Sequence, residues 1–276
     1  MTTFGRRIYL EVGAPGSTGK RIDGLKITFE GDKDDVGTPN RAKISVFNLN
    51  ADSAALLQRE GVVVQLFAGY EGQVDLMFLG DVTRAITTIE GASARTVIES
   101  GDGHRAVSTT QANVTLKGET DVKAALTATI KDLVSNPDQI IKSLSGDVLD
   151  QKLPRGFTAS GPVKTVLRGL AASRRFDWFY LDGELVILDR DSALKEPAVK
   201  VSRETGLIGS PARLTGAGSK GIQLRVTLNG KIRPRRLLDL ESREFTGFYL
   251  VKKVQHRGDN FGGDHYTQIE AIEVVP

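Results

Sequence analysis

The chain has 276 residues, of which 39% are hydrophobic and 26% charged, so it is expected to fold into one large or two ordinary soluble domains. It has no cysteine, which excludes disulfides, thiolate nucleophiles and zinc–cysteine sites, and its net charge of +3 is too balanced to indicate nucleic-acid binding by charge alone. No apolar run reaches the ~18 residues of a membrane-spanning helix, and residues 1–7 lack the apolar stretch of a signal peptide, so we expect no stable membrane insertion and synthesis in a cytoplasm.

The first hundred residues are predicted to form a series of short strands. Apolar and polar residues alternate there with period two, and clusters of Gly, Asp and Asn separate the runs. The predicted strands are 7–12, 25–30, 42–47, 62–69, 74–79, 82–90 and 94–100. One short helix over 50–58, capped by Asn50 or Asp52, interrupts them. Many short strands with turns between them indicate a barrel or a sandwich.

The middle of the chain has helical periodicity. One helix is predicted over 120–134, with Asp121 in its first turn, and a second over 160–174, with Ser160 as its cap. A hairpin follows over 176–189, because Asp182-Gly183 between two apolar runs is a strong signal for a two-residue turn. This part therefore reads as a small α+β insert.

Strand patterns return after residue 198, over 221–228, 237–240, 247–256 and 267–275. The fold class is thus mainly β with an α+β insert, a small helix-hairpin domain between two barrel-like halves. The predicted division is 1–110 for the first β-barrel, 111–198 for the insert and 199–276 for the second β-barrel, which can share strands with its neighbours.

Two short segments resemble phosphate or calcium loops without meeting the requirements. Ala14 to Arg21 has the spacing of a P-loop, but Arg21 replaces the hydroxyl residue that holds magnesium, and a strand follows where a helix is needed. Asp32 to Gly37 begins like an EF-hand loop, but Val36 and Lys43 occupy two of the ligand positions. We interpret the first as a hairpin loop and the second as a solvated acidic loop.

The histidines offer a weak metal-site candidate. His256 and His265 are close in sequence to Asp259 and Asp264, whereas His104 stands alone. The segment between the two is rich in Gly, Asp and Asn, which favours a loop without metal. No Gly-x-Ser-x-Gly nucleophile elbow occurs. We therefore predict no catalytic residue, no metal site and no cofactor.

The densest basic cluster is the candidate for a partner-contact loop. It consists of Lys231, Arg233, Arg235 and Arg236. One interpretation is an electrostatic contact to an acidic partner or to DNA in transit. The other is a solvated loop between strands, because Pro234 cannot donate to a sheet ladder.

Three stretches taken together resemble the baseplate hub proteins of contractile-tailed bacteriophages and tailocins. The first runs over 47–50, 61–72 and 78–82, where a strand ending in Ala-Gly-Tyr-Glu-Gly precedes a Phe-Leu-Gly-Asp-Val strand. The second is the helix and hairpin that contain Trp178 and Asp182-Gly183-Glu184-Leu185. The third, over 204–211, 247–259 and 266–271, matches the family's closing strand pair with its Gly-Asp turn.

The resemblance implies a structural protein and not an enzyme. In such hubs, two tail-tube-like β-barrels per subunit lie side by side, and three subunits close into a ring around a central channel. The homotrimer presents sixfold symmetry to the tail tube protein and threefold symmetry to the central spike protein. Tape measure protein and other baseplate proteins are further expected partners, with DNA present only in transit. The expected location is the virion tail baseplate, assembled in the host bacterial cytoplasm.

Two other readings stay open. A distal-tail or tube-terminating ring has a similar build and is distinguished by six subunits in place of three. A tail-tip peptidoglycan hydrolase would need a pair of acidic residues in a cleft. The sequence pattern leaves such a pair open, but no segment resembles a lysozyme-like domain.

Overall fold

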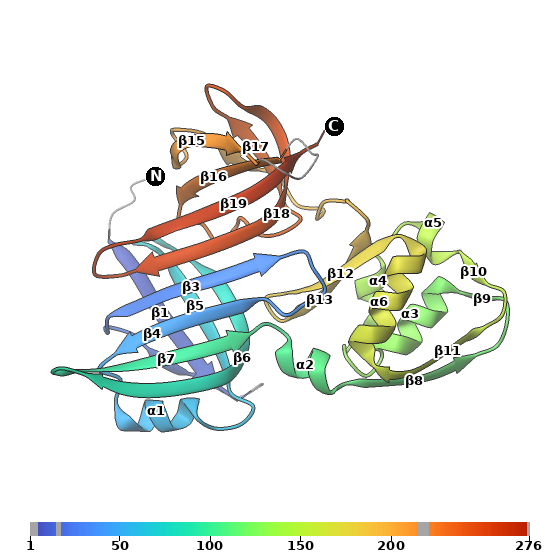
Figure 1. Cartoon of the computed structure of the whole chain (residues 1–276), viewed down its shortest axis with the longest axis horizontal. Helices are drawn as coiled ribbons and strands as arrows, with labels where there is room; N and C mark the ends of the chain where they lie inside the picture. Colours follow the sequence, from blue (N-terminus) through green and yellow to red (C-terminus); the bar gives the residue numbers. More distant parts are fainter. Residues whose placement is uncertain (1–4, 15–17, 215–220, 275–276) are drawn as a thin grey trace. The chain divides into compact units, whose positions relative to one another are not determined.

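The computed structural model describes residues 5–14, 18–214 and 221–274, and the chain divides into two compact units (Figure 1). Unit 1 comprises residues 1–34, 40–102 and 194–276, so it contains both β-rich ends of the chain. Unit 2 comprises residues 35–39 and 103–193. The second unit is therefore inserted into the first along the sequence.

Unit 1 is built on one 13-stranded sheet, antiparallel except where β14 pairs with β17. Its main path runs β15-β16-β19-β18-β3-β4-β7-β6-β5-β1-β2. The strands are β1 (Arg6–Gly13), β2 (Lys20–Ile22), β3 (Ile27–Asp34), β4 (Arg41–Phe47), β5 (Val63–Tyr70), β6 (Gln73–Glu90), β7 (Ser93–Gly101), β14 (Val199–Val201), β15 (Leu207–Arg213), β16 (Gly221–Thr227), β17 (Leu237–Glu241), β18 (Thr246–Asp259) and β19 (His265–Glu273). The helix α1 (Ala51–Leu57) follows β4, and the side chain of Asn50 caps it.

The two ends of the chain form separate hydrophobic cores within this unit. The strands of the N-terminal part alternate between buried and partly exposed residues, and their buried faces meet around Leu10, Leu66 and Ile98. The C-terminal strands bury a second cluster around Leu224, Leu240 and Ile269. Alternation with period two therefore gives each half one apolar face to pack.

Strand β18 joins the two halves into one sheet. One edge of β18 pairs with β19 along its length, with a register shift between Val251 and Lys253. The other edge pairs first with β17 and then, from Lys253 to Asp259, with β3. The bulge accompanies this exchange of partners, as expected where a strand bends.

Unit 2 packs short helices and three two-stranded sheets around a core of its own. Its elements are α2 (His104–Thr109), β8 (Gln111–Leu116), β9 (Thr120–Asp121), α3 (Val122–Ile130), α4 (Pro137–Ile141), α5 (Gly146–Leu149), β10 (Lys152–Leu153), β11 (Phe157–Pro162), α6 (Val163–Arg174), β12 (Phe176–Leu181) and β13 (Glu184–Asp189). Helix α6 buries Val163, Leu167 and Leu170, which lie on one helical face.

The hairpin of β12 and β13 has the turn that its sequence predicts. Asp182 and Gly183 both have positive φ, at 52° and 88°, as a two-residue type I′ turn requires. Trp178 on β12 lies against Gly37, where an added Cβ would come within 2.8 Å of the indole ring. A side chain at position 37 would therefore collide with the tryptophan, whereas glycine leaves room for the ring.

The structure confirms most of the predicted elements and corrects two. The runs predicted as separate strands over 74–79 and 82–90 form the single strand β6, because Gly80 is not a turn residue: it lies where a Cβ would come within 2.8 Å of Gly101. Ser160 does not cap a helix, since it lies in β11 and α6 begins after Pro162. Asp121, predicted to lie in the first turn of a helix, is instead the N-cap of α3, because its carboxylate accepts a hydrogen bond from the Ala124 N–H.

Candidate partner-contact site

The basic loop predicted to contact a partner lies between β16 and β17 in unit 1. Its backbone is fixed at both ends. The Lys231 N–H donates to Oδ1 of Asn229 at 2.9 Å, and the Arg235 N–H donates to the Val251 carbonyl at 2.8 Å. Arg235 has a φ of 65°, so the chain reverses there before it enters β17. The four cations are thus placed on an ordered turn.

Two of the four cations are used inside the chain. Arg233 forms an ion pair with Oε1 of Glu196, and Arg236 Nη1 lies 2.9 Å from Oε2 of the same carboxylate. Arg236 also donates to the Pro197 carbonyl at 3.1 Å and to the Lys231 carbonyl at 3.1 Å. These contacts fasten the segment around Glu196, where the chain re-enters unit 1, to the loop.

The other two cations differ from each other. Arg235 is only 2% exposed, and its carbonyl accepts a hydrogen bond from the Leu194 N–H at 2.8 Å. It therefore also helps to hold the segment around Glu196 against the loop. Lys231 is exposed. Sequence reasoning missed this arrangement because Glu196 lies in a different stretch of the chain, and only the pairing of the two segments brings it to the arginines. A contact between the loop and an acidic partner stays a prediction, and Lys231 is the cation exposed for it.

The two histidines near the C-terminus have separate protein partners. His256 is buried on β18, and its Nδ1 lies 2.9 Å from the hydroxyl of Thr267. Burial, with a smaller contribution from the charge of Lys33, lowers the pKa of His256 from 6.5 to about 3. His265 lies 3.3 Å from the Gly69 carbonyl, and burial lowers its pKa to about 4. Both rings are therefore neutral near pH 7. The side chain of His104 lies outside the described residues.

The carboxylates of the metal-site candidate are also engaged elsewhere. Oδ1 of Asp259 accepts the backbone N–H groups of Phe261 and Gly262, at 2.8 and 3.2 Å, and so closes its own turn. Asp264 lies 4.0 Å from Arg257. Across residues 5–14, 18–214 and 221–274, no group of three or more His, Asp or Glu residues is arranged to hold a metal ion.

The P-loop-like segment and the acidic segment both lead into or lie within strands, which does not suit nucleotide or calcium binding. Residues 15–17 of the P-loop-like segment lie outside the described part of the chain, but Lys20 begins β2, which pairs with β1. No helix therefore follows the lysine. In the acidic segment, Asp32 and Asp34 belong to β3. The Asp32 carboxylate accepts from the Gln255 amide at 2.9 Å.

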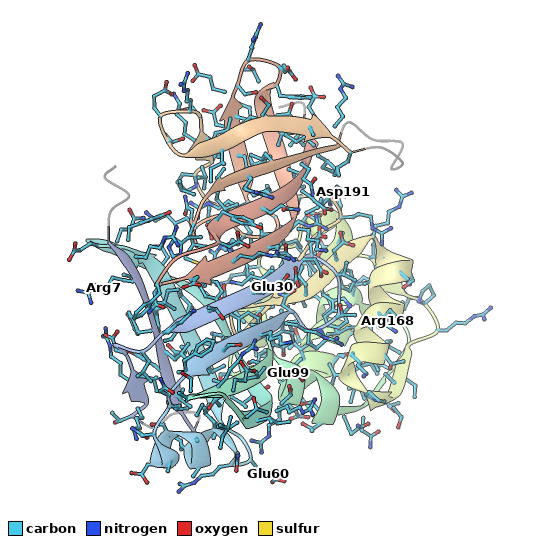
Figure 2. All side chains as sticks on the ribbon, turned by 60° about the vertical axis from the view of Figure 1, so that its left-hand side comes forward. Arg7, Glu30, Glu60, Glu99, Arg168 and Asp191 are labelled. Carbon is cyan, nitrogen blue, oxygen red and sulfur yellow. The ribbon has the colours of Figure 1, made fainter. Side chains whose placement is uncertain are left out.

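A row of alternating charges crosses the sheet of unit 1. In the pairing register, Arg257 on β18 lies opposite Glu30 on β3, which lies opposite Lys43 on β4. Lys43 lies opposite Glu99 on β7, and Glu99 lies opposite Arg84 on β6. Figure 2 shows Glu30 and Glu99 on this sheet, and Glu30 accepts from Arg257 at 2.6 Å. Each charge in this row has a neighbour of opposite sign on the adjacent strand, which stabilises the sheet.

No protein-family model matches the chain, and no curated protein matches it. In the part of the chain that the structure describes, no helix is both long and apolar enough to cross a membrane.

Solved structures share the fold over almost the whole chain. A tail protein from Neisseria meningitidis MC58 matches with a TM-score of 0.66 and 12% identity, covering 98% of this chain and 97% of that one. The 43 kDa tail protein of prophage MuSo2 from Shewanella oneidensis matches with a TM-score of 0.64 and 9% identity, covering 97% and 98%. The E. coli c3393 protein, a type VI secretion component structurally similar to the T4 tail proteins gp27 and gp5, matches at 0.62 and 11%, covering 96% and 77%.

These identities establish a likeness of fold. The chain is mainly β with a large antiparallel sheet and has the fold of phage tail proteins, as the resemblance to baseplate hubs predicted. The similarity extends over both units of the chain, because each of the three structures covers nearly all of it.

Proposed function

We propose that the protein is a structural baseplate hub subunit of a phage-type contractile tail. The observation that carries the proposal is the fold match to tail proteins over 98% of the chain, with nearly all of the matched protein covered in return. A match of both chains along their length means that the likeness is to a whole tail protein and not to one common domain. The described site residues fit a structural role, because their charges are used to hold the chain together.

The hub reading assigns a tube-like barrel to each β-rich end, over 1–110 and 199–276, with 111–198 as the insert. The two separate cores of unit 1 support this assignment, since each half packs an apolar face of its own. Three subunits with two barrels each would present six similar modules to a sixfold tube and three subunits to a threefold spike. Such a ring closes when one contact repeats about an axis.

The proposed partners are the tail tube protein, the central spike protein, further copies of this chain and other baseplate proteins, with the tape measure protein among them. The proposed location is the tail of the virion. DNA is proposed to be present only in transit through the channel of the ring. Lys231 is the proposed contact point of the basic loop.

The proposal is tested by the mass of the purified protein in solution, alone and after co-expression with the spike protein of the same particle. Light scattering is expected to give a trimer in at least one of the two samples, because ring closure uses subunit contacts that the spike reinforces. A chain that stays monomeric with the spike contradicts the hub. A stable hexamer transfers the assignment to a distal-tail or tube-terminating ring.

A further inference from the structure

The two halves of unit 1 repeat one order of strand pairing. In the first half, β3 pairs with β4, β4 with β7, β7 with β6 and β6 with β5, all antiparallel. In the second half, β15 pairs with β16, β16 with β19, β19 with β18 and β18 with β17, again all antiparallel. Strand β6 in the first half therefore has β18 as its equivalent in the second.

Both of these long strands change their pairing at the same point. Strand β5 pairs with β6 as far as Asp81, and β17 pairs with β18 as far as Leu250. The next residues, Val82 and Val251, each donate their N–H to the residue just before that shorter strand, at 2.8 and 3.0 Å. Directly after these two valines, the register with the hairpin partner shifts in both halves.

The hairpin partners of the two strands share a short sequence. A Thr-x-Ile-Glu run begins at Thr96 in β7 and at Thr267 in β19. The glutamate of each run lies opposite the first paired residue after the shift, which is Arg84 in β6 and Lys253 in β18. The end of β6 is therefore equivalent to the end of β18, residue for residue from these two cations onward.

The two equivalent segments differ in what lies at their second edge. Residues 253–259 of β18 pair with β3 (Figure 1). Residues 84–90 of β6, within the described part of the chain, pair with β7 alone. The equivalent of β3 in the second half is β15, which among the described residues pairs only with β16. One contact of this kind is thus made inside the chain, and the two strands for a second are both open.

Exposed apolar side chains lie on both open strands. Ile86 and Ile89 on β6 are 39% and 84% exposed, and Ile208 on β15 is 42% exposed. A strand with a free edge and exposed apolar side chains is a template for pairing with another strand.

The sizes of the side chains are exchanged between the two contacts. Ile89 is equivalent to Gly258 in β18, where an added Cβ would come within 2.3 Å of Phe29 on β3. In β15, the position of that phenylalanine is taken by the bulge residues 209–211, whose sequence is Gly-Ser-Pro. The closed contact places a large residue on β3 beside glycine, and the open one offers small residues on β15 to an isoleucine.

The backbone of β6 presents hydrogen-bonding groups at its free edge. Ile89 lies opposite Ala94 on β7, but the N–H and C=O of Ala94 bond to Asn48, at 3.0 and 2.7 Å. Ile89 therefore directs its own N–H and C=O away from β7, and Thr87 does so by alternation.

The end of β15 presents such groups as well. The Leu214 N–H donates to the Gly221 carbonyl at 3.0 Å, so Arg213, one residue earlier, directs its N–H and C=O away from β16. Pro211 has no N–H, and the bulge beside it interrupts the register, so regular pairing is confined to residues 212–214.

The register of the open contact follows from the closed one. His256 on β18 lies opposite Gly31 on β3. Following the pairings across each half, the equivalents of these two residues are Thr87 and Arg213. Both direct their backbone groups to the open edges, so they form a hydrogen-bonded pair when the two strands meet in this register.

We propose that residues 84–90 of β6 in one copy pair antiparallel with β15 of the next copy, as β18 pairs with β3 within the chain. In this register Ile86 lies opposite Leu214, and Thr88 lies opposite Ala212. The contact is heterologous, so it repeats about an axis and closes into a ring. The number of three copies rests on the proposed hub, whereas the choice of strands rests on the repeat within unit 1.

The test is a disulfide between copies, because the chain has no cysteine and gives no background. Thr88 and Ala212 are both exposed and form a non-hydrogen-bonded pair in the proposed register. The Cα atoms of such a pair lie about 4.5 Å apart, which a disulfide can span. After oxidation, Thr88→Cys/Ala212→Cys is expected to give covalent species of two and three chains and none larger, with the spike protein co-expressed if assembly requires it.

The matched control is Thr87→Cys/Ala212→Cys, which moves one cysteine by a single residue to the other face of the strand. It is expected to cross-link at least about tenfold less, because the two Cβ atoms then point apart. Circular dichroism checks that every variant is folded. Equal cross-linking of the two double variants overturns the proposal, as does a Thr88→Cys single variant that cross-links as fully as the double variant.

Light scattering on the same samples separates this inference from the hub proposal. A trimer without the cross-link of Thr88→Cys/Ala212→Cys overturns the strand pairing and leaves the hub in place. Cross-linked species that reach six chains keep the strand pairing and contradict the hub. A chain that is monomeric with and without the spike protein overturns both.

Discussion

At the scale of single residues, the buried histidines make folding sensitive to acid. His256 has a pKa of about 3 in the folded protein and an ordinary value of 6.5, so the unfolded chain binds a proton that the folded chain resists. Its contribution to stability is fully present above pH 6.5 and is lost as the pH falls towards 3. The loss approaches about 1.4 kcal/mol per pH unit inside that window. Urea titrations of wild type and His256→Gln from pH 8 to pH 4 measure this slope. A shallower slope for the variant is expected, and equal slopes would show that His256 titrates normally in the folded chain.

Glu196 is the residue on which the basic loop depends. Its carboxylate forms ion pairs with Arg233 and Arg236, and the side chain of Arg236 is only 15% exposed. Glu196→Gln leaves a partly buried guanidinium without its counter-charge, so we expect a loss of about 1–2 kcal/mol in unfolding free energy. Glu241→Gln is the matched control, because the Lys200–Glu241 pair is 61% and 66% exposed and should contribute almost nothing. Equal losses in the two variants would contradict the role given to Glu196.

At the scale of elements, two glycines are expected to respond to alanine with opposite signs. Gly183 has a φ of 88° in the hairpin turn, so Gly183→Ala should destabilise unit 2 by about 1–2 kcal/mol. Gly169 lies inside α6, and an added Cβ there meets nothing within 4 Å. Gly169→Ala should therefore stabilise the same unit by about 0.5–1 kcal/mol. Thermal unfolding of both variants decides the point, and a shift of the same sign would contradict the turn assignment.

The elements also show what can and cannot be read from the sequence. Local signals predicted the hairpin at Asp182-Gly183 and limited the cap of α1 to Asn50 or Asp52, of which the structure shows Asn50, because both features depend on neighbouring residues alone. The prediction of two separate strands around Gly80 is wrong, because the sequence does not distinguish a glycine required for close packing, here against Gly101, from a glycine required for a turn. The partner of Arg233 and the opposite charges of Glu30 could not be predicted, since each depends on pairing between distant segments.

At the scale of the whole molecule, the family resemblance supplied what periodicity could not. Strand patterns alone indicated a barrel or a sandwich and gave no order for the strands. The pairing of β3 with β18, which joins the two halves of unit 1, connects residues more than two hundred positions apart. Such a contact has no local signal in one sequence. The likeness to phage tail proteins, first expected from three stretches of sequence, is confirmed by the solved structures as a likeness of fold over nearly the whole chain.

The copy number in an assembled tail tests the hub proposal most directly. Cryo-electron microscopy of intact tails, with this chain located by its fold, counts the subunits at the junction between tube and spike. The account predicts three copies in a closed ring, with two β-barrel modules of each subunit facing the tube. Six copies, or a position away from that junction, would contradict it.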